Sequence, residues 1–333
     1  MVTARKQRGM ALLVVMMVVA IIAALAVKIS GRTQVALQRT LNLAQYDQAY
    51  WYAMSAEELA KKVLKQDLDD SEGRVHLQQY WASPNIVFPV DDGQIAGQIT
   101  DMRSCFNLNA LSVKPTEQEQ QQAQGFTLSL AAKQYQAMLE ALEIDSYGAE
   151  RLTHTLVDYV DSDTEMSPYG AEDADYESRK VPYRAANTLM NHRSELRAVI
   201  GYNQALYQRL QDLVCAIPGE DSQVLNVNTI KPENAELMVG MLQGEISLSD
   251  AQSLINQRPA SGWEKIEEFW EESAVRSLTV SDSIKSSFVI TSSYFDVQSA
   301  AKVDESIFRL SSVMKKGGNN QMQVLTRQFG GQR

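Results

Sequence analysis

The stretch RKQRGMALLVVMMVVAIIAALAV, residues 5–27, decides the fold of this chain. Its last 18 residues, 10–27, contain no charged residue and no proline, and about 17–25 apolar residues are needed to cross a bilayer as a helix. Basic residues lie directly before this run, which places the N-terminal side in the cytoplasm by the positive-inside rule. We therefore expect everything after Val27 to lie outside the cytoplasm.

This stretch has three possible interpretations. A plain signal anchor would stay intact, and a secretory signal would be cut after the A-x-A-like residues 24–26. A cut between Gly9 and Met10 would instead leave the apolar run on the mature chain. Residues 28–65 contain no proline and one glycine, and their apolar residues recur at the three-four spacing of one helix face. The pattern predicts one helix from Met10 to about Lys65, roughly 80 Å long, which a signal peptidase would cut in the middle.

A basic leader ending in glycine, followed by an apolar helix that becomes amphipathic, resembles the type IV pilin and pseudopilin class. The sequence is similar to the K family of type II secretion minor pseudopilins (general secretion pathway protein K, GspK) at residues 8–15, 38–42 and 48–53. Most pseudopilins carry glutamate at the fifth mature position, which is Val14 here, and the K family lacks it. The resemblance implies that a prepilin peptidase cuts between Gly9 and Met10 and methylates the new amine of Met10.

A second informative segment is acidic. Residues 161–177 hold seven carboxylates, which repel one another unless a cation neutralises them. Oxygen ligands without nearby His or Cys favour a hard cation, and calcium tolerates irregular geometry better than magnesium does. Met166 occupies the position where an EF-hand loop needs glycine, so this is not an EF-hand, and a solvated acidic loop remains the alternative. The K family binds calcium in this region, and the expected ligands are Asp161, Asp163, Glu172, Asp173 and Asp175.

The rest of the chain combines strand and helix patterns. Residues 86–90 and 94–101, joined by a turn at residues 91–93, predict a hairpin, and strand patterns return at residues 288–290, 294–303 and 307–314. Between them, helical spacing covers residues 128–141, 149–159, 184–199, 204–213 and 232–270. The tail after Gly317 is expected to be flexible, although residues 324–325 could add a short strand. Residues 106–111 (FNLNAL) and 225–230 (LNVNTI) form an apparent internal repeat.

The second repeat suggests a rival function, because residues 225–270 have the cadence of a helix-hairpin-helix DNA-binding unit. Residues 226–270 contain seven acidic and three basic residues, and the whole chain has a net charge of −10. Phosphate binding requires the opposite sign. A membrane-anchored helix-hairpin-helix DNA-binding protein of a type IV pilus or competence-like system remains the alternative function. A protein-interaction module fits the negative charge of this unit better.

The two cysteines, Cys105 and Cys215, are an even number in a chain expected to be exported, so one disulfide is expected. Two buried thiols are the alternative. Catalysis has little support, because the sequence contains no G-x-S-x-G, P-loop or G-x-G-x-x-G motif. The pair Asp158 and Asp161 could serve acid–base chemistry, but nothing else specifies a sugar cleft. We expect a protein that is not an enzyme.

The resemblance implies an α+β pseudopilin fold, in which a long N-terminal helix packs on an antiparallel β-sheet and a large all-α domain of SAM-like units is inserted. The expected parts are a cleaved leader (1–9), the helix with its transmembrane part (10–29) and first strands (10–110), an inserted helical domain with the calcium loop (111–215), a second SAM-like or helix-hairpin-helix-like unit (216–275), and C-terminal strands completing the sheet with a flexible tail (276–333).

The resemblance also implies a role. The chain is expected to be a minor pseudopilin that caps the tip of the periplasmic pseudopilus and helps to initiate its assembly for export of folded proteins across the outer membrane. Its expected partners are the I- and J-type minor pseudopilins and the major pseudopilin filament, with no nucleic acid. Its expected location is the inner membrane, as a single-pass protein with its C-terminal domain in the periplasm.

Overall fold

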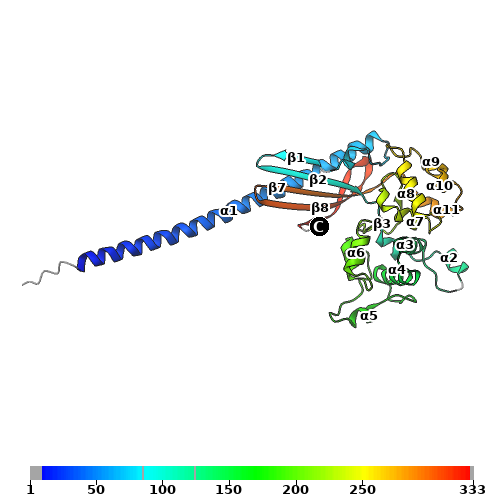
Figure 1. The fold of residues 1–333 in the computed structure, drawn as a ribbon, viewed down its shortest axis with the longest axis horizontal. Helices are drawn as coiled ribbons and strands as arrows, with labels where there is room; N and C mark the ends of the chain where they lie inside the picture. Colours follow the sequence, from blue (N-terminus) through cyan, green and yellow to red (C-terminus); the bar gives the residue numbers. More distant parts are fainter. Residues whose placement is uncertain (1–9, 85, 124, 331–333) are drawn as a thin grey trace, which may run out of the picture.

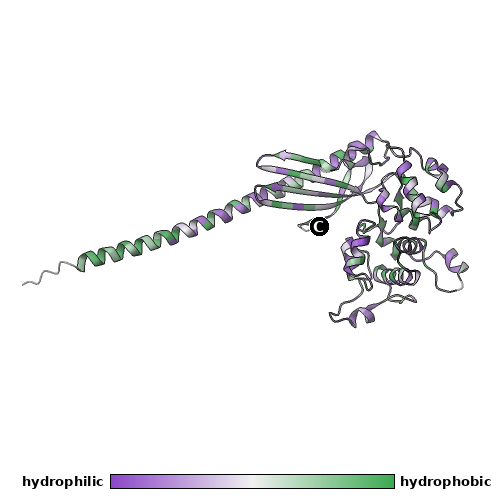
Figure 2. Cartoon of the chain, viewed as in Figure 1, coloured by the Kyte–Doolittle hydropathy of each residue, from purple (hydrophilic) through white to green (hydrophobic). Residues whose placement is uncertain are grey.

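A computed structural model describes residues 10–84, 86–123 and 125–330. Helix α1 (Met10–Asp70) is continuous over 61 residues, so the predicted long helix is confirmed and ends five residues later than expected. Residues 10–44 are exposed on all sides and extend as a rod away from the rest of the molecule (Figure 1). Figure 2 shows that the hydrophobic part of this rod lies at its N-terminal end. Among the described residues, α1 is the one helix long and apolar enough to cross a membrane.

The second half of α1 packs on a five-stranded antiparallel sheet with strand order β1-β2-β7-β8-β9. The strands are β1 (Ile86–Val90), β2 (Gly93–Asp101), β7 (Tyr294–Val303), β8 (Ser306–Lys316) and β9 (Met322–Phe329). Strands β2 and β7 pair from Gly93↔Val303 to Asp101↔Phe295. A Cβ at Gly93 would lie 1.9 Å from the Lys302 carbonyl oxygen, so glycine is required at this end of the pairing.

The core between α1 and the sheet follows from two periodicities. Ala49, Ala53 and Ala60 lie on the buried face of α1, and their small side chains let the helix approach the strands closely. Strand β7 buries alternate residues against this face, among them Phe295 and Val297. Residues that recur every 3.6 positions on the helix and every 2 positions on the strand therefore pack together in one apolar layer.

An ion pair between a buried carboxylate and an arginine at the surface fixes the last strand to α1. Glu57 is completely buried, accepts hydrogen bonds from Arg327 Nε and Nη2 at 2.9 and 2.8 Å, and accepts another from Ser312 Oγ at 2.5 Å. Burial alone would raise the pKa of Glu57, but the hydrogen bonds from Arg327 and Ser312 outweigh it and hold that pKa below its ordinary value. The pair therefore ties β9 to the helix.

Two helical units are inserted between β2 and β7, and both lie at the end of the sheet away from the free half of α1 (Figure 1). The first contains η2 (Leu108–Ser112), α2 (Glu117–Gln122), α3 (Leu130–Ala141), α4 (Ser146–Val160), α5 (Asp173–Glu177), η3 (Arg193–Ala198) and α6 (Gln204–Leu210). The second contains η4 (Pro232–Asn234), α7 (Glu236–Met241), α8 (Leu248–Gln257), α9 (Ile266–Glu271), α10 (Ser273–Arg276) and α11 (Asp282–Ser286). Short 3₁₀ turns elsewhere are η1 (Tyr80–Ala82) and η5 (Gly318–Asn320).

In each unit, a two-residue strand at the start pairs in parallel with a two-residue strand at the end. Strand β3 (Phe106–Asn107) pairs with β4 (Val214–Cys215), and β5 (Leu225–Asn226) pairs with β6 (Phe288–Val289). The second unit therefore extends past the expected boundary at residue 275. Strand β6 was expected in the main sheet, but it lies beside the start of its own unit instead.

The internal repeat is structural, because its asparagines have matching roles. In each N-x-N motif the first side chain accepts a hydrogen bond from the backbone N–H of the second asparagine. The second side chain then pairs with the backbone N–H and C=O of one distant residue, which is Met190 for Asn109 and Trp263 for Asn228. The buried amide thus replaces a missing strand neighbour and holds a loop against the unit.

Two secondary-structure predictions were wrong. Residues 184–199 were expected to form a helix, but only η3 is helical there, because Asn187 has a φ of 43° and Asn109 binds the backbone of Met190. The tail after Gly317 was expected to be flexible, but β9 forms an eight-residue strand there. The Glu57–Arg327 pair, which joins residues far apart in sequence, gives the tail its place.

The expected disulfide is present. Cys105 and Cys215 are joined with an S–S distance of 2.05 Å across a sequence separation of 110 residues. They lie at the two ends of the first helical unit, next to the β3–β4 pair. A cross-link over so long a loop removes much of the conformational freedom of the unfolded chain, so it stabilises the attachment of this unit to the sheet.

We predict that Arg327→Met lowers the free energy of unfolding by about 3 kcal/mol, because it leaves the Glu57 carboxylate buried without its counter-ion. Lys61→Met is the matched control: Lys61 Nζ lies 3.6 Å from the same carboxylate, too far for a hydrogen bond, and donates to Glu58 instead, so its loss should cost less than about 1 kcal/mol. Urea unfolding of the full chain in detergent measures both. Because the pKa of Glu57 is lowered, this stabilisation is present above about pH 4.5 and is lost as the pH falls. Equal effects of the two variants would contradict the assignment.

Candidate functional site

The acidic loop connects α4 to α5 and folds around a carboxylate in the last turn of α4. Both oxygens of Asp158 accept hydrogen bonds from the backbone N–H of Ser167, at 3.3 and 3.2 Å. A Cβ at Gly170 would lie 1.7 Å from Asp158 Oδ2, so only glycine allows the loop to pass this close. The helix then ends at Asp161, whose N–H still donates to the Val157 carbonyl at 2.9 Å. Asp158 thus anchors the loop from inside.

Two of the five predicted ligands have buried oxygens without partners. Asp161 and Glu172 are each only 7% exposed. Asp161 Oδ1 is buried and accepts no hydrogen bond. Both carboxylate oxygens of Glu172 are buried without a hydrogen bond of good geometry, although the Asn187 amide and the Asp173 N–H lie near enough to lower the pKa of Glu172. Buried carboxylate oxygens in folded proteins are normally paired with donors or metal ions. These three oxygens therefore meet the requirement for a cation at this place.

The electrostatics agree with this geometry. Burial raises the pKa of Asp158 to about 6, with a smaller contribution from repulsion by Asp161. Burial also raises the pKa of Asp161 to about 6, and the neighbouring charges of Asp163 and Glu172 add to the shift. The pKa of Glu172 is raised by burial and then by Asp158. The loop therefore gathers negative charges that disfavour one another.

The other three predicted ligands have protein partners. Asp163 Oδ1 accepts from the Glu165 N–H at 2.8 Å, and its Oδ2 lies 2.6 Å from Lys114 Nζ. Asp173 Oδ1 accepts from the Ala185 N–H at 3.0 Å. Asp175 Oδ2 accepts from the Glu172 N–H at 3.3 Å and caps α5. Within the described ranges, no group of three or more His, Cys, Asp or Glu side chains is arranged to hold a metal ion.

The structure places two further residues, Asp158 and Asn187, beside the predicted ligands, and the sequence reasoning did not assign either as a ligand. Asn187 lies beside Glu172, and its buried Oδ1 has no partner. Asp158 could have been found, because it precedes Asp161 by one helical turn on the same face. Asn187 carried no such signal, because its segment has a helical pattern in the sequence and becomes irregular only through tertiary contacts.

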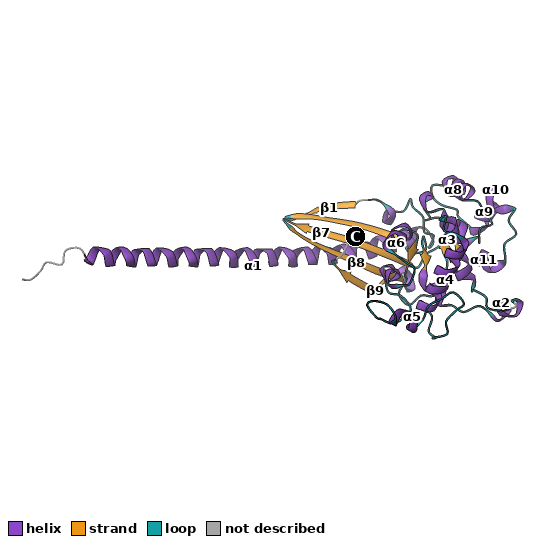
Figure 3. Ribbon diagram, turned by 60° about the horizontal axis from the view of Figure 1, so that its bottom comes forward, coloured by secondary structure: helices purple, strands orange, loops and turns teal. Residues whose placement is uncertain are grey.

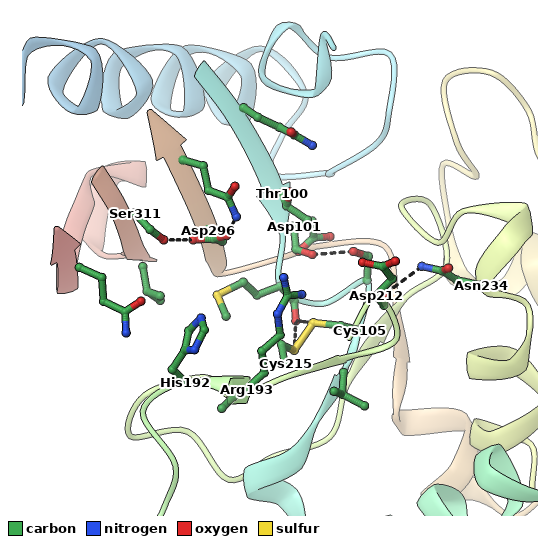
Figure 4. Close-up of a pocket in the computed structure, with 18 of the residues that line it drawn as sticks. Thr100, Asp101, Cys105, His192, Arg193, Asp212, Cys215, Asn234, Asp296 and Ser311 are labelled. Carbon is green, nitrogen blue, oxygen red and sulfur yellow. Dashed lines mark hydrogen bonds between the residues drawn. A yellow bond between two sulfur atoms is a disulfide. The ribbon is translucent and has the colours of Figure 1, made fainter. Parts of the chain in front are cut away.

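A separate polar cleft of about 410 Å³ lies between the sheet and the helical units (Figure 4). The Cys105–Cys215 disulfide and His192 line it. Ser311 Oγ donates to Asp296 Oδ1 at 3.0 Å, and Gln298 donates to Asp296 Oδ2 at 2.8 Å. These three polar side chains thus bind one another, and the two cysteines of the cleft are joined as a disulfide.

Comparison with known proteins identifies the family. Two family models, both described as type II secretion system (T2SS) protein K, match residues 104–219 and 225–291. These ranges coincide with the two helical units. A type II secretion system protein K from Aeromonas hydrophila is 41% identical over 99% of both chains, and one from Pectobacterium carotovorum is 35% identical over 98% of both. The chain belongs to the type II secretion system protein K family.

A solved structure agrees with this assignment. The chain resembles one from the GspK-GspI-GspJ complex of the enterotoxigenic Escherichia coli type 2 secretion system, with a TM-score of 0.77 and 34% identity over 88% of this chain and 100% of that one. The predicted pseudopilin fold is confirmed, and the chain is a minor pseudopilin of the secretion system. The DNA-binding alternative is not favoured, because the supposed DNA-binding unit is the second protein K unit.

Family membership leaves the processing site as a prediction. Met10 is the first described residue and begins α1, and Val14 is 60% exposed on that helix. Gly9 lies outside the described residues. Cleavage between Gly9 and Met10 therefore rests on the sequence.

We predict that the contribution of Asp158 and Asp161 to the free energy of unfolding in chelating buffer falls as the pH rises from about 4 to about 6. Raised pKa values mean that the folded state holds protons on Asp158 and Asp161 that the unfolded state has released, so this stability is complete below about pH 4 and is lost through about pH 6. Tryptophan-detected thermal melting of the full chain measures it. The difference between the wild type and Asp158→Asn isolates the contribution of Asp158, and a variant whose free energy of unfolding varies with pH as that of the wild type does would contradict the prediction.

Proposed function

We propose that this minor pseudopilin caps the tip of a short periplasmic filament, together with the I- and J-type minor pseudopilins, and helps to start its assembly. The similarity to a chain solved in a GspK-GspI-GspJ complex supports these partners. In this role the protein is a structural component rather than an enzyme. It starts in the inner membrane, with α1 as a single span and its C-terminal domain in the periplasm.

The missing carboxylate at Val14 is the observation that carries the tip position. Pilin-like subunits pack their N-terminal helices side by side, and a glutamate at mature position five pairs with the terminal amine of a neighbour. Residues 10–44 of α1 are free for such packing. Val14 offers no acceptor to a further subunit, so a filament containing this chain has no electrostatic site for growth beyond it.

The shape of the molecule supports the same position. The two helical units form a bulky mass beyond the end of the sheet, on the side away from the free half of α1 (Figure 3). Another subunit stacked in the direction of that mass would have to displace it. The part formed by α1 and the sheet is narrower than the two helical units (Figure 3). A subunit of this shape fits the end of a filament better than its middle.

We predict that Val14→Glu impairs secretion, because the new carboxylate accepts the amine of a subunit that should not follow. Val14→Leu is the control, since it changes the size of the side chain but adds no charge. The measurement is export of a type II substrate, with filament formation scored in parallel, in cells whose own protein K gene is deleted. Normal secretion and filament initiation by the glutamate variant would remove the basis of the tip proposal.

We also propose that the acidic loop binds calcium. Asp161 and Glu172 supply the buried free oxygens, and Asp163, Asp173 and Asp175 remain the predicted additional ligands. The donor set contains only oxygen, which suits a hard cation. When bound, the ion would neutralise the carboxylates. The chain's own contribution is to hold Asp161 at the end of α4 and Glu172 at the start of α5, so that binding connects the two helices.

We predict that calcium stabilises the chain by about 2.7 kcal/mol at a hundred times its Kd. Asp161→Asn and Glu172→Gln should each lose most of this effect. Glu177→Gln is the matched control from the same loop, because its side chain is half exposed and pairs with Arg184. Thermal melting with calcium or with chelator measures the shift. If neither calcium nor chelator changes the melting temperature of the wild-type chain, calcium binding is refuted.

A further inference from the structure

Lys114 lies over the acidic loop although it belongs to a different segment. Its Nζ is 2.6 Å from Asp163 Oδ2, and its side chain is 66% exposed. The hydrogen bond to Asp163, with the nearby charges of Asp161 and Glu165, raises the pKa of Lys114 above its ordinary value. A monovalent cation that belongs to the chain itself therefore already partly neutralises the loop.

Lys114 also holds the connection between η2 and α3 against this loop. Lys114, Pro115 and Phe126 of this connection line a cavity of about 390 Å³. The carboxylates of Asp158, Asp161 and Asp163 line the same cavity. The segment is largely exposed and contains only the short helix α2, which is stabilised by its own capping box. Its other contacts include the Phe126 ring, which lies tilted against the His154 ring with centroids 5.0 Å apart. The pairing of Lys114 with Asp163 is one of the contacts that hold this segment, so its loss increases the freedom of the segment.

Both oxygens of Asp163 are already engaged, one by the Glu165 N–H and one by Lys114. A divalent ion that takes Asp163 as a ligand must compete with the ammonium group for Oδ2. We infer that Lys114 is a tethered competitor of the cation, so that calcium binding at the acidic loop displaces Lys114 and releases residues 113–123. This inference rests on the proposed calcium site and adds its regulation: the segment covers the loop when Lys114 is paired and is freed when the ion binds.

The expected effect is modest, because Lys114 is largely exposed and solvent screens its charge. Removing it should tighten calcium binding about two- to fivefold. Lys133→Met is the matched control: Lys133 Nζ lies 3.6 Å from Glu119 Oε1 on α2, so the variant removes the same charge and loosens the same segment without touching the acidic loop. Its calcium affinity should equal that of the wild type.

The first test is calorimetric titration of calcium into the chelator-stripped full chain in detergent. Lys114→Met should tighten binding, and in an Asp163→Asn background the same substitution should change nothing, because its competitor site is gone. This double-mutant cycle isolates the Lys114–Asp163 pair. Unchanged or weaker binding by Lys114→Met, or an equal gain in both backgrounds, would overturn the inference while leaving calcium binding intact.

The second test reads the segment directly. Amide hydrogen exchange of residues 113–123 should become several-fold faster when calcium is added to the wild type, and should be fast with and without calcium in Lys114→Met. Calcium that binds without changing this exchange would overturn the inference. A wild-type chain that shows no heat of binding and no melting shift would overturn the calcium proposal itself, and the regulation with it.

Discussion

The structure depends on one long-range pairing, the antiparallel register of β2 with β7. It joins residues 93–101 to residues 295–303 and so closes the sheet across both inserted units. The second half of α1 can bury its alanine face only because this sheet is complete. The cost of closing so long a loop is lowered by the two inserted units, because each holds its own ends together with a short parallel strand pair. The ends of the insertion are thus close before the sheet forms.

The two units solve this problem with the same chemistry. Each opens with an N-x-N motif whose buried side chains replace absent strand neighbours, and the first unit adds a disulfide between its ends. Buried amides are costly unless every donor and acceptor is used, so the motif specifies one arrangement of each unit. This explains how a small sheet carries a helical mass larger than itself while the geometry of the connection stays fixed.

The acidic loop differs from the N-x-N motifs, because some of its buried polar groups have no partner. Its carboxylates are gathered rather than dispersed, and burial of Asp161 and Glu172 without partners works against folding stability. Because the buried carboxylates destabilise the fold, a bound cation that neutralises them would stabilise it, and the stability of the loop would then respond to the cation. The pairing of Lys114 with Asp163 reduces the same repulsion from within the chain. The loop, its cation and the segment above it are therefore coupled through shared carboxylate oxygens.

Local pattern alone determined much of this protein. The apolar run and three-four spacing predicted α1, alternation predicted β1, β2, β7 and β8, and the oxygen-only composition of residues 161–177 pointed to a hard cation. These features could be predicted because each depends on neighbours in sequence. Tertiary structure decided the rest: β6 left the sheet for β5, β9 became ordered through Glu57, and residues 184–192 lost their helix to Asn109. It also separated the carboxylates with free oxygens from those with partners, because burial and pairing depend on residues that are distant in the chain.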